Sequence, residues 1–214
     1  MRAVPLIVAS LGLAGAAMLG LEAQARQGED ALLNTRRWTL VNPLADARRP
    51  APAWKNQSWL NTDYPITLES LRGRVVLLNF WVFTCINCTN TIPSLVDFDR
   101  KYRDQGLTII GVHTPEFPPY AGEHDKKNLA HALQQRGITY PNAQDNDNAT
   151  WDLYGIRYWP SFVLIDAKGE IRHYGYGEFH LNDEIYGKWD GWIQELLAEV
   201  GKRTGDGEWG TEKR

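Results

Sequence analysis

Residues 75–93 read Val-Val-Leu-Leu-Asn-Phe-Trp-Val-Phe-Thr-Cys-Ile-Asn-Cys-Thr-Asn-Thr-Ile-Pro, and this stretch decides the fold. Residues 75–82 form a nearly continuous apolar run rich in β-branched and aromatic side chains, which predicts a central strand covered on both faces. The pattern of residues 93–102 has the period of a helix. Cys85 therefore falls where a strand passes into a helix, so free backbone N–H groups and the helix dipole can stabilise a thiolate there. Cys88 follows one turn later on the same face.

Cys85 and Cys88 are the two cysteines of the chain. A disulfide between them would close a very short loop, which restrains little of the unfolded chain, whereas a structural disulfide gains more from a long loop. The spacing therefore favours redox chemistry over a structural role.

Composition excludes several classes of function. The chain has 214 residues, which suits one domain of ordinary size, and 43% of them are hydrophobic, enough for a real core. The formal net charge is −3, so the chain has no basic field that would attract nucleic acid.

The N-terminus has the pattern of a secretory signal. Residues 3–21 carry no charge, Arg2 precedes them, and Ala23-Gln-Ala25 supplies small residues spaced for cleavage. We interpret residues 1–25 as a signal peptide, with an uncleaved membrane anchor as the alternative, because the apolar run approaches the ~20 residues that span a bilayer. Both interpretations place the remaining chain outside the cytoplasm, with membrane contact only through this segment if it stays uncleaved.

Three further parts follow. Residues 26–58 are interrupted by prolines and paired arginines, and we expect an N-terminal extension that tethers the domain or packs along its edge. Residues 59–200 form the folded domain. Residues 201–214 are polar and glycine-rich, which predicts a disordered tail.

Within the domain, strands and helices alternate, which argues for a parallel α/β core. The sequence predicts a second buried strand at residues 107–113 and helices at about 123–136, 148–154 and 187–200. Residues 158–173 have the pattern of a β-hairpin with a Lys-Gly turn.

The pattern Phe80-Trp81-Xaa-Xaa-Xaa-Cys85-Xaa-Xaa-Cys88, with a proline five residues on, resembles the active site of thioredoxin-like proteins. Its Thr-Cys-Ile-Asn-Cys form is similar to the TlpA-like and DipZ-like extracytoplasmic branch. The resemblance implies an α/β thioredoxin-like fold, a central mixed sheet flanked by helices, with a TlpA-type insertion and an N-terminal extension.

The same resemblance implies thiol–disulfide exchange. Cys85 would attack and Cys88 would resolve the mixed disulfide. Pro160 would be cis, face the cysteines and hold the substrate chain beside the backbone of Trp159, while Trp81 and Thr84 belong to the substrate-binding surround. No cofactor or metal is expected beyond the redox-active disulfide between the two cysteines.

Three departures from the family pattern bear on the chemistry. Thr84 stands where many thioredoxins have tryptophan, which leaves the site less shielded. The dipeptide Ile86-Asn87 separates the cysteines, and because this dipeptide tunes the potential, both the reductant and the oxidant role stay open. Asn79 stands where thioredoxins have a buried acid, and an amide cannot accept the proton of Cys88.

Glu116 is the candidate for that missing base. It follows the second predicted strand, at the edge of a parallel sheet where loops converge on the active site. Neighbouring prolines would stiffen its loop and partly dehydrate its carboxylate.

Two other functions stay open. A peroxide-reducing thioredoxin-fold enzyme would use one peroxidatic cysteine, and a copper-delivery module would use Cys85, Cys88 and a histidine, since thiolates suit Cu(I). For exchange, the expected partners are protein thiols or disulfides and a membrane or periplasmic electron donor or acceptor.

Overall fold

The central strand is β3 (Val75–Trp81), and each of its residues is buried. In the computed structural model, which describes residues 48–205, it lies inside a seven-stranded sheet of order β1-β7-β6-β3-β4-β5-β2. The predicted signal peptide, most of the N-terminal extension and residues 206–214 of the predicted tail lie outside the described residues. The sheet is mixed, as predicted, because β3 pairs in parallel with β4 (Leu107–His113) and antiparallel with β6 (Ser161–Ile165).

The remaining strands extend the sheet on both sides. β5 (Asn142–Gln144) continues the parallel part beyond β4, and β2 (Trp59–Leu60) pairs with it antiparallel. On the other side, β7 (Glu170–Tyr176) forms the predicted hairpin with β6, and β1 (Arg49–Pro50) pairs with β7. Parallel neighbours β3 and β4 end at the same edge of the sheet, which is where Cys85 lies.

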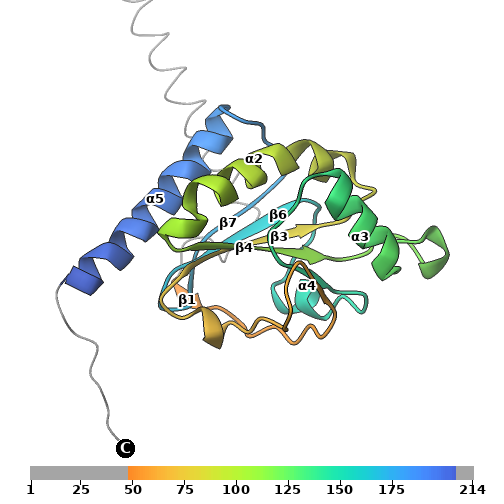
Figure 1. Cartoon of the computed structure of the whole chain (residues 1–214), viewed down its shortest axis with the longest axis horizontal. Helices are drawn as coiled ribbons and strands as arrows, with labels where there is room; N and C mark the ends of the chain where they lie inside the picture. The colour runs from red at the N-terminus through yellow and green to blue at the C-terminus, as the bar shows by residue number, and fades with distance from the viewer. Residues whose placement is uncertain (1–47, 206–214) are drawn as a thin grey trace, which may run out of the picture. The chain divides into compact units, whose positions relative to one another are not determined.

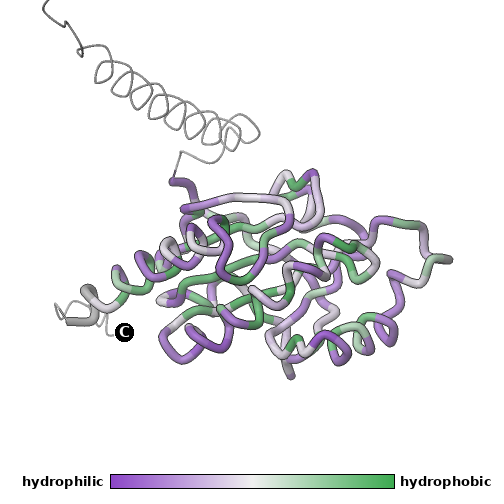
Figure 2. The backbone as a smooth tube through the Cα atoms, turned by 90° about the horizontal axis from the view of Figure 1, so that it is seen from above, coloured by the Kyte–Doolittle hydropathy of each residue, from purple (hydrophilic) through white to green (hydrophobic). Residues whose placement is uncertain are grey.

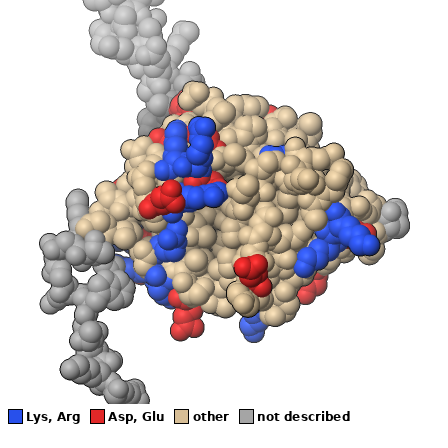
Figure 3. Space-filling model, in the orientation of Figure 1, with Lys and Arg blue, Asp and Glu red and all other residues tan. Residues whose placement is uncertain are grey.

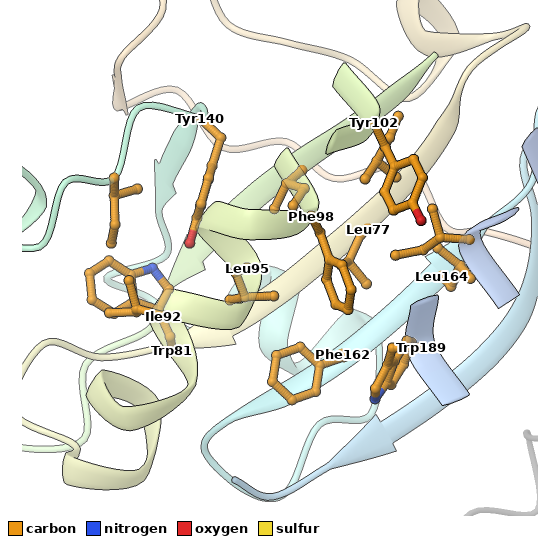
Figure 4. Close-up of a cluster of buried hydrophobic side chains, with 14 of the residues drawn as sticks. Leu77, Trp81, Ile92, Leu95, Phe98, Tyr102, Tyr140, Phe162, Leu164 and Trp189 are labelled. Carbon is orange, nitrogen blue, oxygen red and sulfur yellow. The ribbon is translucent and has the colours of Figure 1, made fainter. Parts of the chain in front are cut away.

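Helices α2 (Ile86–Tyr102), α3 (Lys126–Gln135) and α5 (Glu184–Gly205) cover one face of the sheet (Figure 1). Figure 4 shows the core beneath them, where Phe98 of α2 and Trp189 of α5 meet Leu77 and Phe162 of the sheet. Removing side chains of this size from water supplies about 1.5–3 kcal/mol each, which is why α2 is fixed firmly on the sheet behind the cysteines.

The opposite face is covered by short elements. The 3-10 helix η1 (Glu69–Leu71), helix α4 (Ala149–Leu153) and the segment before β2 enclose a second core that contains Phe80, Trp54 and Trp151. Figure 2 shows hydrophobic residues along the inner strands and hydrophilic ones along the outer loops. A strand buried on both faces reads as a continuous apolar run, and β3 does so for this reason.

Residues 48–58, assigned from the sequence to the extension, pack on the domain. Trp54 donates through Nε1 to the carbonyl of Ile66 at 2.8 Å, and Asn56 donates through Nδ2 to the carbonyl of Gln144 at 2.9 Å. These long-range contacts have no signature in the local sequence.

Two helices differ in their ends from the prediction. α3 begins at Lys126 rather than about residue 123, because the side chain of Asp125 accepts the N–H of Lys127 and caps the helix. α5 begins at Glu184 rather than residue 187, where Asp183 accepts the N–H of Tyr186, and continues through Gly201 to Gly205. The helix thus takes in residues 201–205 of the segment that the sequence assigns to the tail.

The described surface carries charges of both signs. On the face in Figure 3, basic and acidic side chains lie next to one another in several groups, with uncharged surface between the groups. Within residues 48–205, no helix combines the length and the apolar character needed to cross a membrane.

Candidate active site

Cys85 lies at the N-cap of α2, between the central strand and the helix, as the sequence predicts. Its Sγ accepts the backbone N–H of Cys88 at 3.2 Å, and its carbonyl accepts the N–H of Thr89 at 3.1 Å. The Cys85 side chain is half-buried, whereas Cys88 is 2% exposed. Both are free thiols, and a partner can reach the first but not the second.

The two thiols have opposite acidities. The thiol of Cys88 donates a hydrogen bond to Cys85, and this bond, with the N–H groups of Cys88 and Asn87, outweighs burial and lowers the pKa of Cys85 to about 7. The carboxylate of Glu116 acts in the opposite direction on the same sulfur. Burial, and then the bond to Cys85, raises the pKa of the Cys88 thiol far above its usual value. Near neutral pH a large fraction of Cys85 is therefore ionised, whereas Cys88 stays protonated and can donate to the Cys85 sulfur.

Pro160 directly precedes β6, which pairs antiparallel with β3, the strand that leads to the cysteines. The peptide bond between Trp159 and Pro160 is cis, as the family resemblance implies. Trp159 stacks on Trp151 with ring centroids 4.1 Å apart, and it donates through Nε1 to the carbonyl of Thr114 at 3.1 Å. The proline turn is thus tied to the loop that follows β4. That Pro160 faces the cysteines and holds a substrate chain stays a prediction.

Trp81 lies beneath the site rather than on its surface. Its ring is fully buried, and its Nε1 donates to Oδ1 of Asn142 in β5 at 2.9 Å. The prediction that Trp81 contacts the substrate is therefore wrong, because the ring is committed to the core. Thr84, by contrast, is exposed beside Cys85, although its hydroxyl already donates to Glu123.

His113, at the end of β4, supports the turn from inside. Its Nε2 accepts the backbone N–H of Phe83 at 3.3 Å, and its ring stacks on Phe83 with centroids 5.2 Å apart. Burial lowers the pKa of His113 to about 3, so the imidazole is neutral at physiological pH and stays an acceptor.

Glu116 does not have the environment predicted for it. Its side chain is exposed, so the expectation that the prolines dehydrate its carboxylate is wrong. The buried acid of this loop is Glu123, which folds beneath the loop and accepts the backbone N–H groups of Glu116 and Phe117 at 2.7 and 2.8 Å. The sequence predicts Glu123 in the first turn of a helix, and no local pattern distinguishes it from an exposed acid.

Three large apolar side chains in the segments that form the site are open to solvent: Ile86 is 68% exposed, Phe117 50% and Tyr158 51%. Water-exposed apolar groups beside a reactive thiolate suit contact with another polypeptide. Among the described residues, no group of three or more His, Cys, Asp or Glu side chains is arranged to hold a metal ion.

Comparison with known proteins finds a family whose model matches this chain, and solved structures with a similar fold. The model of the AhpC/TSA family matches residues 47–174. Thiol-disulfide oxidoreductase YkuV of Bacillus subtilis is 30% identical over 132 residues, 61% of this chain and 85% of YkuV. The solution structure of a thioredoxin-like protein in the oxidized form superposes with a TM-score of 0.61 at 27% identity, covering 71% of this chain and 97% of that one.

A more similar relative is much larger. Protein DipZ of Mycobacterium tuberculosis is 51% identical over 126 residues, which are 58% of this chain but 18% of DipZ. The chain therefore spans about a fifth of the length of DipZ.

Proposed function

The chain belongs to the AhpC/TSA family, and from this premise we propose that it is a thiol-disulfide oxidoreductase that acts through Cys85 and Cys88. One observation carries the proposal. The two thiols differ in exposure and in acidity in the way that stepwise exchange requires, with a thiolate at the surface and a protonated thiol behind it.

In the reducing direction, the Cys85 thiolate attacks one sulfur of a partner disulfide. The partner S–S bond breaks, a mixed disulfide forms, and the departing partner sulfur leaves as a thiolate that takes up a proton. Cys88 then loses its proton and attacks Sγ of Cys85. The Cys85–Cys88 disulfide forms, the partner's second thiol is released, and two electrons have passed to the partner. The oxidising direction is the reverse.

The surroundings of the cysteines fit each step. The N–H of Cys88 and the start of α2 stabilise the Cys85 thiolate before attack and after it is displaced. Burial keeps Cys88 protonated until Cys85 is engaged, since it raises the pKa of the Cys88 thiol. When Cys85 enters a mixed disulfide, its negative charge is lost, and that charge no longer opposes ionisation of Cys88.

The acceptor for the Cys88 proton is either water or Glu116. Glu116 is a candidate because its carboxylate is exposed and its charge reaches the Cys85 sulfur. Glu116→Gln should slow the resolution of a mixed disulfide and flatten its pH dependence. Exchange at the parent rate from about pH 5 to about pH 8 would identify water as the acceptor.

We assign the reaction to an extracytoplasmic compartment, on the signal-like sequence of residues 1–25. There the partners would be protein thiols or disulfides, and a membrane or periplasmic donor or acceptor would restore the active-site pair. The exposed Ile86, Phe117 and Tyr158 supply the apolar surface on which such a polypeptide would rest.

A trapping experiment tests the proposal. Cys88→Ser should accumulate a mixed disulfide between Cys85 and a protein disulfide substrate, since the resolving thiol is absent, and Cys85→Ser should accumulate none. Equal trapping by both variants would refute the assigned roles. Supplying hydrogen peroxide in place of the disulfide tests the peroxide-reducing alternative, which requires faster oxidation of Cys85 by peroxide than by disulfide.

A further inference from the structure

Glu123 is a fully buried carboxylate, 0% exposed, in the loop between β4 and α3. It accepts three hydrogen bonds: Oε1 takes the hydroxyl of Thr84, and Oε2 takes the N–H groups of Glu116 and Phe117. No Lys, Arg or His of the described residues forms an ion pair with it. Carboxylates are rarely buried to this degree, and an expensive arrangement of this kind usually positions something.

The partners of Glu123 belong to two different parts of the site. Thr84 immediately precedes the nucleophilic Cys85, whereas Glu116 and Phe117 lie in the loop that leaves β4. The start of this loop is held as well, because the N–H of Thr114 donates to the carbonyl of Trp81 at 3.0 Å. Glu123 therefore links this loop by hydrogen bonds to Thr84, the residue that precedes the nucleophilic Cys85.

The tied loop leaves two side chains free to face a partner. The backbone N–H groups of Glu116 and Phe117 are fixed by Glu123, while both side chains are exposed. Two titratable groups act on the Cys85 sulfur: Cys88 from α2, and Glu116 from this loop, whose charge raises the pKa of the thiol. The effect of Glu116 on the Cys85 pKa depends on where the loop holds the Glu116 carboxylate. If the loop were released, solvent would screen this charge from the Cys85 sulfur.

We propose that Glu123 is a positioning residue, which ties the loop of residues 114–122 to Thr84 and thereby holds the Glu116 carboxylate beside the Cys85 sulfur. The proposal deepens the proposed function and rests on it for the role of Cys85. It also implies that the edge of the site that faces a partner carries the Glu116 carboxylate next to the Phe117 ring. A target cysteine with a basic or apolar neighbour would meet this edge with complementary chemistry.

The test measures the rate at which iodoacetamide alkylates Cys85 in the reduced full chain, as a function of pH, with the labelled peptide identified by mass spectrometry. Glu116→Gln removes the opposing charge, so alkylation about one unit below the parent pKa should accelerate by about twofold to fivefold. Glu123→Ala should produce a similar acceleration, because it releases the Glu116 carboxylate. The double variant should match Glu116→Gln alone, since the two changes act on one carboxylate.

Glu123→Gln is the matched control. Its amide oxygen can accept both N–H groups and its NH₂ can donate to the Thr84 hydroxyl, so it should keep the parent profile. If Glu123→Ala does not fold, Thr84→Val removes one of the three bonds and should shift the profile in the same direction, while Thr84→Ser should not.

Three results would overturn the proposal. The first is that Glu123→Ala folds and keeps the parent's pH dependence of alkylation although Glu116→Gln changes it. The second is that the double variant accelerates alkylation by the combined effects of the two single variants. The third, if only the threonine variants fold, is a parent-like profile for Thr84→Val. Alkylation requires no protein partner, so the proposal can fail while the trapping experiment succeeds, and the trapping experiment can fail while the proposal stands.

Discussion

The backbone N–H of Cys88 donates to Sγ of Cys85 across 3.2 Å, so the resolving cysteine stabilises the nucleophilic one before either has reacted. The contact exists because Cys85 caps the helix in which Cys88 lies three residues later. An N-cap side chain ordinarily accepts such a bond through oxygen, and here a sulfur takes that place. The same spacing that permits a disulfide therefore also makes one thiol acidic.

The first prediction concerns selective alkylation of the reduced protein. At about pH 6 to 7 Cys85 should be labelled well before Cys88, since the pKa of Cys85 is about 7 and burial raises that of Cys88. Peptide mapping after brief alkylation measures the order. Unfolding in denaturant is the control, because both thiols then return to ordinary acidity and should react alike; labelling of Cys88 first in the folded protein would reverse the roles.

The second prediction concerns the pH dependence of the reduction potential. Below the Cys85 pKa of about 7, reduction takes up two protons with two electrons, and the potential should fall by about 59 mV per pH unit. Above it Cys85 stays ionised and Cys88 takes the only proton, so the slope should halve to about 30 mV per pH unit. Equilibration with glutathione buffers measures this, and an unbroken slope from about pH 5.5 to about 8.5 would contradict the assigned acidity.

The third prediction concerns acid stability. The pKa of His113 is lowered to about 3 by burial, so between about pH 6.5 and pH 3 the unfolded chain binds a proton at this site that the folded chain does not. The stabilisation is present above pH 6.5 and is lost as the pH falls, by on the order of 4 kcal/mol in total.

His113→Gln should flatten that loss, because the amide oxygen can still accept the N–H of Phe83 but does not titrate. Urea unfolding at several pH values measures it. His131→Gln, on the exposed side of α3, serves as the control and should keep the parent's pH dependence. An equally steep loss in His113→Gln would show that other groups cause the acid sensitivity.

The fourth prediction concerns packing under the site. A Cβ on Gly111 would lie 1.9 Å from Oδ1 of Asn142, the atom that accepts the Trp81 Nε1–H. Gly111→Ala should therefore destabilise the fold by about 1–3 kcal/mol, through overpacking and a disturbed buried hydrogen bond.

Gly191→Ala is the matched control for this change. A Cβ on Gly191 meets no atom within 4 Å, and the residue lies inside α5, so alanine should stabilise the helix by about 0.5–1 kcal/mol. Denaturant midpoints of the two variants should move in opposite directions. A neutral Gly111→Ala would mean that Asn142 can move aside without cost.

Much of the fold could be predicted from the sequence because its signals are local. The apolar run of residues 75–82, the strand at Leu107–His113 and the hairpin after Pro160 are periodic or continuous patterns, and the structure confirms each of them. Burial on both faces favours apolar side chains at nearly every position, so a central strand such as β3 can be recognised from its sequence although it contains Asn79. The cysteine spacing likewise carries its chemistry within one helical turn.

The tertiary structure alone decided which acid of the loop after β4 is buried and which aromatic side chains face the solvent. Glu116 and Glu123 share one loop, and their local sequence contains nothing that selects the second for burial; the Thr84 hydroxyl, from a distant part of the chain, does so. Trp81 was expected among the substrate-binding residues, yet its ring is fully buried and its Nε1 donates to Asn142 of β5. The sequence determines what each segment can form by itself, whereas a buried polar group finds its hydrogen-bond partner only when the chain is folded, and that requirement fixed these positions.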